Sequence, residues 1–251
     1  MSVPAVTLFG VTISKLNMEQ TVEYLTSAIE SGTPHQVITA NPIMMMEGLR
    51  NEKYREVLKQ AELVVPDGAG LVWAARYAGN PVAERVAGYD LLHRLLERGQ
   101  RFGWKVYLLG AAPDVVRDAA ERLRQLYPGI RIAGYRDGFF TDDQDEEIVR
   151  EIAGLKPDLL FVANSLHRQE PWIGQYKRRL RVPVMMGVGG SFDIIAGRLK
   201  RAPLLFQKLR LEWLFRLLQE PSRYKRMLDL PKFVIHVIRN KESIRREQKE
   251  L

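Results

Sequence analysis

The stretch Val64-Val65-Pro66-Asp67-Gly68-Ala69-Gly70 indicates how this chain is built. A short apolar, β-branched run ends in a single carboxylate, and glycines follow at once. In α/β folds the sheet fixes the backbone at a strand end while the loop leaves the side chain accessible. At that position Asp67 is suited to act as a general base. Arg85, not far along the chain, is suited to stabilise an anionic leaving group. An N-cap of the following helix explains Asp67 equally well.

Similar apolar runs alternate with helical patterns along most of the chain. They cover residues 36–39, 62–65, 105–109, 130–133, 159–162 and 182–186. Nearly continuous apolar runs are typical of strands that are buried on both faces. Strand–helix alternation predicts an α/β fold of the Rossmann-like kind, in which helices flank a mostly parallel sheet. Residues 3–13 are compatible with a small additional hairpin.

The composition excludes several kinds of site. The 251 residues contain no cysteine, which excludes disulfides, a thiolate nucleophile and a Cys-ligated metal. The four histidines have no metal-ligand spacing. Asp143 and Asp145 match an Asp-x-Asp metal pattern, but acidic residues are also favoured in the first turn of a helix. We therefore expect solvated charge there, and neither a metal nor another cofactor.

Charge divides the chain into two parts. Residues 196–251 hold 15 Lys and Arg against 6 Asp and Glu, whereas residues 1–195 hold 23 against 24. We expect a catalytic α/β domain over residues 1–195. Residues 196–251 then form a basic, amphipathic helical appendage of two or three pieces that contacts an anionic membrane surface and completes the active site. No apolar run approaches the ~20 residues that span a bilayer, so we expect a cytoplasmic protein attached peripherally to the inner face of the membrane.

Two glycine-containing turns are candidates for binding a nucleotide. Gly110 and Ala111 follow one strand and open a helix, which favours an anion, although tight turns without a ligand look the same. Gly187, Gly189 and Gly190 form a denser cluster, followed by Ser191 and Asp193. Clustered glycines indicate close approach of a ligand or an unusual turn. We predict a nucleotide-diphosphate cradle with Asp193 near a ribose or base; a tight turn capped by Ser191 is the alternative.

Polar side chains at other strand ends are suited to hydrogen-bond the hydroxyl groups of a sugar. Thr39 ends the run over residues 36–39, Asn41 follows that run, and Gln169 follows a later one. Asn41 precedes a proline, so a helix cap explains it as well. In the appendage, Arg216, Arg223 and Arg226 can gather on one side of adjoining turns, where they suit a diphosphate or a lipid surface.

Several motifs occur together in a familiar order. These are Thr39-Ala40-Asn41-Pro42, Val65-Pro66-Asp67-Gly68, Glu84-Arg85-Val86-Ala87-Gly88-Tyr89-Asp90, Tyr107-Leu108-Leu109-Gly110-Ala111, Gln169-Glu170-x-Trp172-Ile173, Gly187-Val188-Gly189-Gly190-Ser191-Phe192-Asp193, Lys200-Arg201-Ala202-Pro203, Leu211-Glu212-Trp213, Glu220-Pro221-x-Arg223-Tyr224 and Leu230-Pro231. By these motifs, over nearly its whole length, the chain resembles the WecG/TagA/CpsF family, glycosyltransferase family 26.

The resemblance implies a membrane-associated, metal-independent, inverting glycosyltransferase. Such an enzyme passes a sugar, for which N-acetylmannosamine is the first expectation, from a UDP donor to undecaprenyl-diphosphate-linked GlcNAc in teichoic acid or related polysaccharide synthesis. It also implies that Asp67 is the base and that Thr39, Asn41 and Gln169 line the pocket. The tail arginines would lie over the acceptor diphosphate.

Other interpretations remain open at this stage. UDP-N-acetylmannosaminuronic acid and UDP-glucose are the alternative donors. A protein of another class, a non-catalytic, membrane-docked nucleotide-binding protein, also fits; a nucleic-acid partner is not expected. Met44, Met45 and Met46 suit either the core or a subunit contact, which leaves a homo-oligomer open. The family usually has Gly-x-Pro-Lys before Gln169, where this chain has Ser165-Leu166-His167-Arg168.

Overall fold

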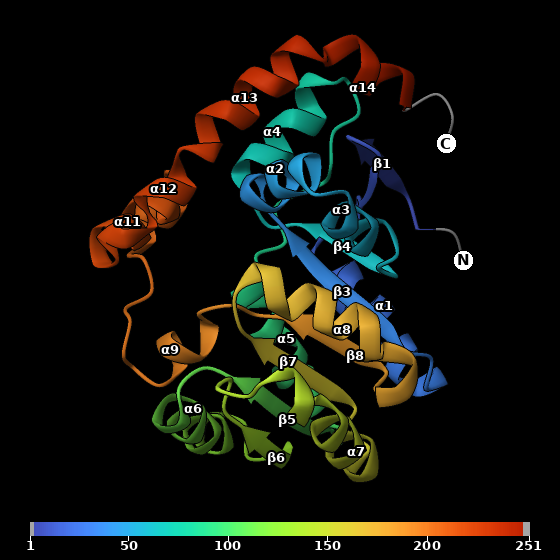
Figure 1. Cartoon of the computed structure of the whole chain (residues 1–251), viewed down its shortest axis with the longest axis vertical. Coiled ribbons are helices and arrows are strands. Elements are labelled where there is room, and N and C mark those ends of the chain that lie inside the picture. The colour runs from blue at the N-terminus through green and yellow to red at the C-terminus, as the bar shows by residue number, and fades with distance from the viewer. Residues whose placement is uncertain (1–2, 248–251) are drawn as a thin grey trace.

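A six-stranded, all-parallel sheet forms the centre of the protein in the computed structural model, which describes residues 3–247. The strand order is β4-β3-β8-β7-β5-β6. The strands are β3 (His35–Ala40), β4 (Leu63–Pro66), β5 (Lys105–Gly110), β6 (Arg131–Arg136), β7 (Leu159–Ala163) and β8 (Val184–Gly187). All six predicted strands are present, and the predicted α/β fold is confirmed (Figure 1).

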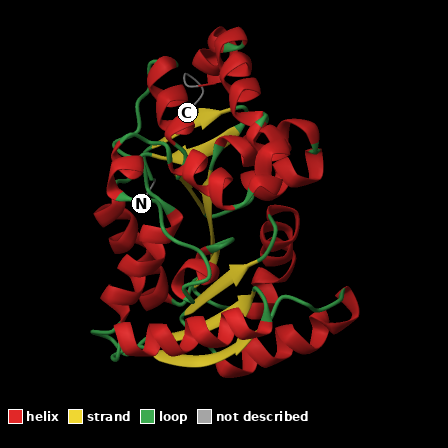
Figure 2. Cartoon of the chain, turned by 90° about the vertical axis from the view of Figure 1, so that its left-hand side faces the viewer, coloured by secondary structure: helices red, strands yellow, loops and turns green. Residues whose placement is uncertain are grey.

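Helices cover both faces of this sheet (Figure 2). One face carries α1 (Met18–Ser31), α5 (Gly88–Gly99), α6 (Pro113–Leu126) and α9 (Ser191–Ile195). The other carries α2 (Pro42–Arg50), α3 (Glu52–Lys59), α4 (Ala69–Tyr77), α7 (Asp145–Leu155) and α8 (Leu166–Leu180). Successive residues of a strand point to opposite faces, so Val106 and Leu108 enter one core while Tyr107 and Leu109 enter the other. This double burial explains why the strands read as unbroken apolar runs.

The predicted N-terminal hairpin is also present. Strands β1 (Ala5–Leu8) and β2 (Val11–Ser14) pair antiparallel and form a separate two-stranded sheet. Its apolar side chains join the core beneath α2, α3 and α4. Met44, Met45 and Met46 belong to the same core, with at most 8% exposure, so the methionine run lies in the core of this chain.

Residues 204–247 form a basic helical segment, which we call the appendage. It is more fragmented than the two or three pieces predicted. Its helices are α10 (Leu204–Lys208), α11 (Glu212–Gln219), the 3₁₀ turn η2 (Pro221–Arg223), α12 (Tyr224–Met227), α13 (Asp229–Arg239) and α14 (Lys241–Glu247). The chain leaves the body after α9, passes along one side of the molecule and ends with α13 and α14 near α4 (Figure 1).

Helix α13 fixes the appendage to the body. Phe233 and Val237 are fully buried in the core formed by the hairpin and α2 to α4. The ring of Phe233 packs edge-on against Phe9 at 6.0 Å between centroids. Arg50 of α2 forms an ion pair with Asp229 at the start of α13. One end of the appendage is therefore part of the folded core.

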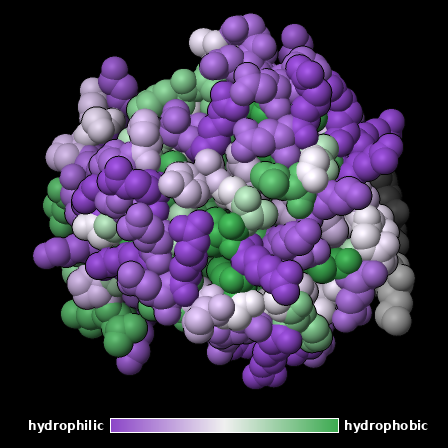
Figure 3. All heavy atoms as spheres, turned by 90° about the horizontal axis from the view of Figure 1, so that it is seen from below, coloured by the Kyte–Doolittle hydropathy of each residue, from purple (hydrophilic) through white to green (hydrophobic). Residues whose placement is uncertain are grey.

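Large apolar side chains are exposed on the appendage and also on α6, β6 and α7, where Leu126, Tyr135 and Leu155 are exposed. At the end that carries β6, α6 and α7, hydrophilic residues cover most of the face and hydrophobic ones occur in separate groups (Figure 3). The appendage exposes large apolar side chains repeatedly along its length. These are Leu204, Leu205, Leu209, Trp213, Leu218, Tyr224, Leu228, Val234, Ile235 and Ile238.

A buried carboxyl group lies beneath the glycine turn that follows β8. Glu170 in α8 is 1% exposed, and its Oε1 accepts from Gln169 Nε2 at 2.9 Å. Gln36 Nε2 donates to the backbone oxygen of Glu170 at 2.9 Å. Among the described residues, Glu170 Oε2 and Gln36 Oε1 have no hydrogen-bond partner. Burial raises the pKa of Glu170 to about 7.

We predict that Phe233→Ala destabilises the protein by about 3 kcal/mol, because truncating a fully buried Phe loses its transfer free energy and leaves a cavity. Urea unfolding measures this difference. Ile235→Ala on the same helix is the control, since Ile235 is 49% exposed, and its free energy of unfolding should stay within about 0.5 kcal/mol of wild type. Equal losses in the two variants would contradict the anchoring role of Phe233.

We predict that Glu170→Gln stabilises the protein more at pH 8 than at pH 5. Because the pKa of Glu170 is higher in the folded state, the folded state holds the proton more tightly, and stability falls as pH rises through the interval from about 4.5 to about 7. The amide removes this loss, which is of order 3 kcal/mol. Denaturant unfolding at both pH values tests this; a difference between the proteins that does not change with pH would refute it.

Candidate active site

A cavity of about 580 Å³ lies between the body and the appendage. Asn41, Asp67 and Arg85 line it from the body, and Arg216 and Arg223 line it from the appendage. Asn41 and Asp67 directly follow the neighbouring parallel strands β3 and β4, so the sheet places them side by side. The structure thus brings together five of the residues that the sequence singled out.

Asp67 is held by its backbone and by its side chain. Its amide donates to Ala40 O at 2.8 Å, and its Oδ2 accepts from Gly88 N at 3.1 Å. Helix α4 begins after Gly68 with no side-chain cap, so Asp67 does not cap the helix that follows it. Its carboxylate instead meets the first turn of α5. That helix N-terminus favours negative charge, and the side chain remains 26% exposed.

Glycines allow this close packing. A Cβ on Gly68 would lie 2.4 Å from Pro42 Cδ, and one on Gly88 would lie 2.8 Å from Thr39 Oγ1. The turns that follow β3 and β4 and the start of α5 therefore approach more closely than side chains allow. Thr39 packs against Gly88 and is not among the residues that line the cavity.

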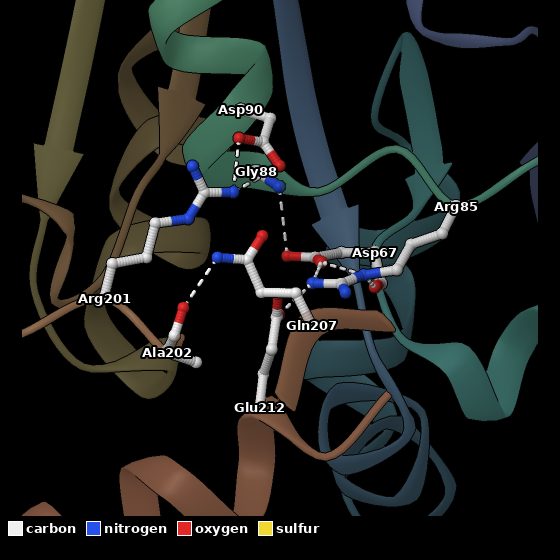
Figure 4. A network of polar contacts seen from close by, with 8 residues as sticks. All are labelled: Asp67, Arg85, Gly88, Asp90, Arg201, Ala202, Gln207 and Glu212. Atoms are coloured by element: carbon white, nitrogen blue, oxygen red, sulfur yellow. Dashed lines mark hydrogen bonds and ion pairs between the residues drawn. The ribbon is translucent and has the colours of Figure 1, made fainter. Parts of the chain in front are cut away.

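Arg85 connects Asp67 to the appendage (Figure 4). Its Nε and Nη2 both donate to Asp67 Oδ1 at 3.2 Å, and its Nε also donates to the Asp67 carbonyl. The same Nη2 donates to Glu212 Oε2 of α11 at 2.5 Å. Although burial opposes the charge, the carboxylates of Asp67 and Glu212 raise the pKa of Arg85.

The pKa of Asp67 lies above that of an ordinary aspartate. Burial is the largest cause and raises it, whereas Arg85, the Gly88 amide and Arg216 lower it and offset burial only in part. Desolvation makes the carboxylate more basic, and the cations keep it able to ionise. A carboxylate in this balance can accept a proton from a hydroxyl group in the cavity.

Asn41 serves partly as a helix cap. Its Oδ1 accepts from the amides of Ile43 and Met44 at 3.0 and 3.2 Å, which begins α2. This orientation leaves the Nδ2 group as the part of Asn41 that can donate to a ligand. The cap and the pocket interpretations of the sequence therefore both describe this residue.

The structure does not bring Gln169 to the cavity wall. It is 7% exposed, and its Oε1 accepts from Asn164 N at 3.2 Å and from Gly189 N at 3.1 Å. Gln169 thus joins the end of β7 to the glycine turn after β8. Ser165 and the residues after it begin α8 directly, and Arg168 packs over the Phe140 ring at 4.5 Å.

The glycine turn after β8 borders open space. A Cβ on Gly187 would lie 2.2 Å from Glu170 Oε1, so packing alone requires that glycine. Gly189 has a positive φ of 49° with nothing within 4 Å of a Cβ, and Gly190 faces only Asp193 and Arg223. Ser191 Oγ donates to Val188 O at 2.6 Å. The tight turn predicted as the alternative is therefore present, and it leaves Gly189 and Gly190 accessible.

The turn at Gly110 and Ala111 has a packing explanation. A Cβ on Gly110 would lie 2.1 Å from Ala163 O on the neighbouring strand, and the Ala111 amide donates to that same oxygen at 2.8 Å. Neither residue lines the cavity, and β7 separates their strand from β8. The structure gives no separate support to a nucleotide contact at this turn.

The tail arginines gather near the glycine turn. Arg223 is half-buried and forms an ion pair with Glu220 at 2.8 Å. Burial is the first cause that lowers the pKa of Arg223, and repulsion by Arg216 and Arg226 contributes. Arg226 is exposed and lies outside the cavity wall. Three guanidinium groups that repel one another favour an anion between them.

Sequence reasoning missed the acidic and aromatic part of the cavity. Arg201 of the chain before α10 forms two hydrogen bonds to Asp90, at 2.6 and 2.8 Å, and lies over the Tyr89 ring. These residues and Glu212 line the cavity. The signal that could have identified Glu212 is its negative charge, because residues 196–251 hold only 6 Asp and Glu against 15 Lys and Arg.

The Asp-x-Asp pattern does not present two solvated carboxylates. Asp145 is buried and accepts from Trp172 Nε1 at 2.9 Å and from Tyr176 OH at 3.1 Å. The expectation of solvated charge is wrong for Asp145, which instead joins α7 to α8. Within residues 3–247, no group of three or more His, Asp or Glu is arranged to hold a metal ion.

Comparisons with known proteins identify the family. The model of the glycosyl transferase WecG/TagA/CpsF family matches residues 6–247. The N-acetylglucosaminyldiphosphoundecaprenol N-acetyl-beta-D-mannosaminyltransferase of Bacillus spizizenii is 40% identical over 207 residues, 82% of this chain and 80% of that protein. Proteins with the same name from Bacillus subtilis strain 168 and Staphylococcus aureus strain MW2 are each 34% identical over 94% and 96% of this chain, and over 92% and 95% of their own length. This chain belongs to the WecG/TagA/CpsF family of glycosyl transferases.

Proposed function

We propose that this protein transfers N-acetylmannosamine from a UDP donor to GlcNAc linked to undecaprenyl diphosphate. The names of the relatives support this choice of sugar and acceptor. We propose teichoic acid synthesis as the process that this transfer serves. One observation carries the proposal: a partly exposed carboxylate, Asp67, faces a cavity that also presents Arg85, Arg216 and Arg223. A base beside several cations suits attack by a hydroxyl on a sugar diphosphate.

The proposed reaction is a single displacement. Asp67 accepts the proton of the acceptor hydroxyl, whose oxygen forms a bond to the anomeric carbon of the donor. The bond from that carbon to the diphosphate oxygen breaks, and UDP leaves with the electron pair. Attack opposite the leaving group inverts the anomeric configuration. The elevated pKa of Asp67 suits this role, because a more basic carboxylate takes up the proton more readily.

Protein groups take the place of a metal in this proposal. Arg223 lies beside Gly190, and the open backbone at Gly189 and Gly190 lets a diphosphate approach closely. Arg216 and Arg223 line the cavity, so they can pair with the diphosphate of the donor or of the acceptor. Asp193, which interacts electrostatically with Arg223, is the residue that this proposal assigns to the nucleoside.

The appendage is proposed to meet an anionic membrane surface. In the described part of the chain, no helix has the length and apolar character needed to cross a bilayer. The exposed leucines of α10 lie in a basic segment, and this combination suits insertion at the level of the headgroups. A lipid-linked acceptor would then reach the cavity from the membrane side.

We predict that Asp67→Asn lowers transfer at least 100-fold, because the amide keeps the shape but cannot accept the proton. The assay measures UDP release and glycolipid formation from UDP-N-acetylmannosamine and a short prenyl-diphosphate-GlcNAc. UDP-N-acetylmannosaminuronic acid and UDP-glucose are tested in parallel to identify the donor. Transfer at the wild-type rate by the variant would refute Asp67 as the base. If wild type preferred one of the other donors, the proposed sugar would be wrong.

We predict that Leu204→Glu combined with Leu205→Glu reduces binding to anionic vesicles at least tenfold. These side chains are 71% and 64% exposed, so the change removes apolar area and adds charge repulsion without disturbing a core. Co-sedimentation with phosphatidylglycerol vesicles measures the effect. Leu126→Glu, at a residue of α6 that is 58% exposed, is the control and should bind as wild type does. Equal losses in both proteins would contradict docking through the appendage.

A further inference from the structure

Two carboxylates from different parts of the chain share one guanidinium group. Arg85 Nη2 lies 3.2 Å from Asp67 Oδ1 and 2.5 Å from Glu212 Oε2. Asp67 follows β4, whereas Glu212 begins α11 of the appendage. All three side chains are only 24–28% exposed, so solvent screens their interactions little. Figure 4 shows the three in one chain of contacts.

Several other charged side chains near Asp67 have partners of their own. Among the described residues that line the cavity, the charged side chains are Asp67, Arg85, Asp90, Arg201, Arg210, Glu212, Arg216 and Arg223. Asp90 is held by two hydrogen bonds from Arg201, and Arg223 pairs with Glu220. Glu212 is therefore the acid of the appendage that reaches the cation holding Asp67.

We propose that Glu212 is a positioning residue for Asp67. By accepting one N–H of Arg85, it orients that guanidinium and links docking of the appendage to the state of the carboxylate. This inference rests on the proposed function, in which Asp67 accepts the proton. Neither the family motif nor the tail's basic character assigns such a role to Glu212.

The physical reason is competition for one positive charge. An arginine that pairs with a single carboxylate stabilises its ionised form strongly and makes it a weak base. When Glu212 takes part of that charge, Arg85 still orients Asp67 but lowers its basicity less. With the appendage undocked, Arg85 would pair with Asp67 alone. The base would then reach full strength only once α11 closes over the cavity.

Glu212→Gln tests this, because it removes the negative charge and keeps the shape. We expect kcat to fall about tenfold, and the acid limb of the pH–rate profile to move to lower pH by about 0.5 to 1 unit. The sign follows from the pKa: without Glu212, Arg85 stabilises ionised Asp67 more, so protonation of Asp67 requires more acid. Glu212→Asp keeps the charge and should restore the wild-type limb at least in part.

Asp229→Asn is the matched control. It removes another acidic contact between the appendage and the body, with Arg50, far along the chain from Arg85. If Glu212 only helps to dock the appendage, both variants should change kcat and KM alike and leave the acid limb in place. We expect a shifted limb in Glu212→Gln alone; the same behaviour in both variants would overturn the proposal.

A direct titration separates this inference from the proposed reaction. The ¹³C signal of the Asp67 carboxyl group, assigned by its loss in Asp67→Asn, reports the pKa without any substrate. We expect a lower midpoint in Glu212→Gln than in wild type, whichever sugar the enzyme transfers. An unchanged midpoint in folded protein, checked by circular dichroism, would refute the role of Glu212. Absence of transfer by wild type would refute only the proposed function.

Discussion

The contacts of Arg85 with Asp67 and Glu212 are the interaction on which the site depends. A half-buried carboxylate and a half-buried guanidinium each lose hydration, so each is stable only where it is paired and hydrogen-bonded. The Gly88 amide at the start of α5 supplies a further bond to Asp67. Because the partners come from β4, the segment before α5 and α11, satisfying these charges fixes how the sheet, a helix and the appendage meet.

Close backbone packing makes that arrangement feasible. Gly68 and Gly88 bring the segments around Asp67 together, and Gly187 accommodates the buried Glu170 beneath the turn after β8. Gly189 and Gly190 differ from these, because they border open space beside Arg223. The glycines of this chain therefore have two roles: some permit contact within the protein, and others leave backbone available to a ligand.

The appendage is anchored in the core and also closes one side of the cavity. Phe233 buries one end of it in the core, while α11 and the turn at Arg223 complete the cavity wall. The exposed leucines of α10 lie between the body and α11 along the chain. A surface that binds those leucines would thus act on the segment that carries Glu212 and Arg216, which gives a physical route from docking to the chemistry at Asp67.

The sequence by itself determined the fold class, the strands and the charge division, because these follow from local patterns: apolar runs, caps and the signs of side chains. It also indicated Asp67, Arg85, Asn41, Arg216 and Arg223, which the cavity unites. Tertiary structure decided what local patterns do not encode. In the folded protein Gln169 and Thr39 pack against other parts of the chain, and Gly110 lies against β7. Asp145 is buried. Glu212 contacts Arg85, which is 127 residues away in the sequence. These outcomes depend on which distant segments meet, and that depends on how the whole chain packs.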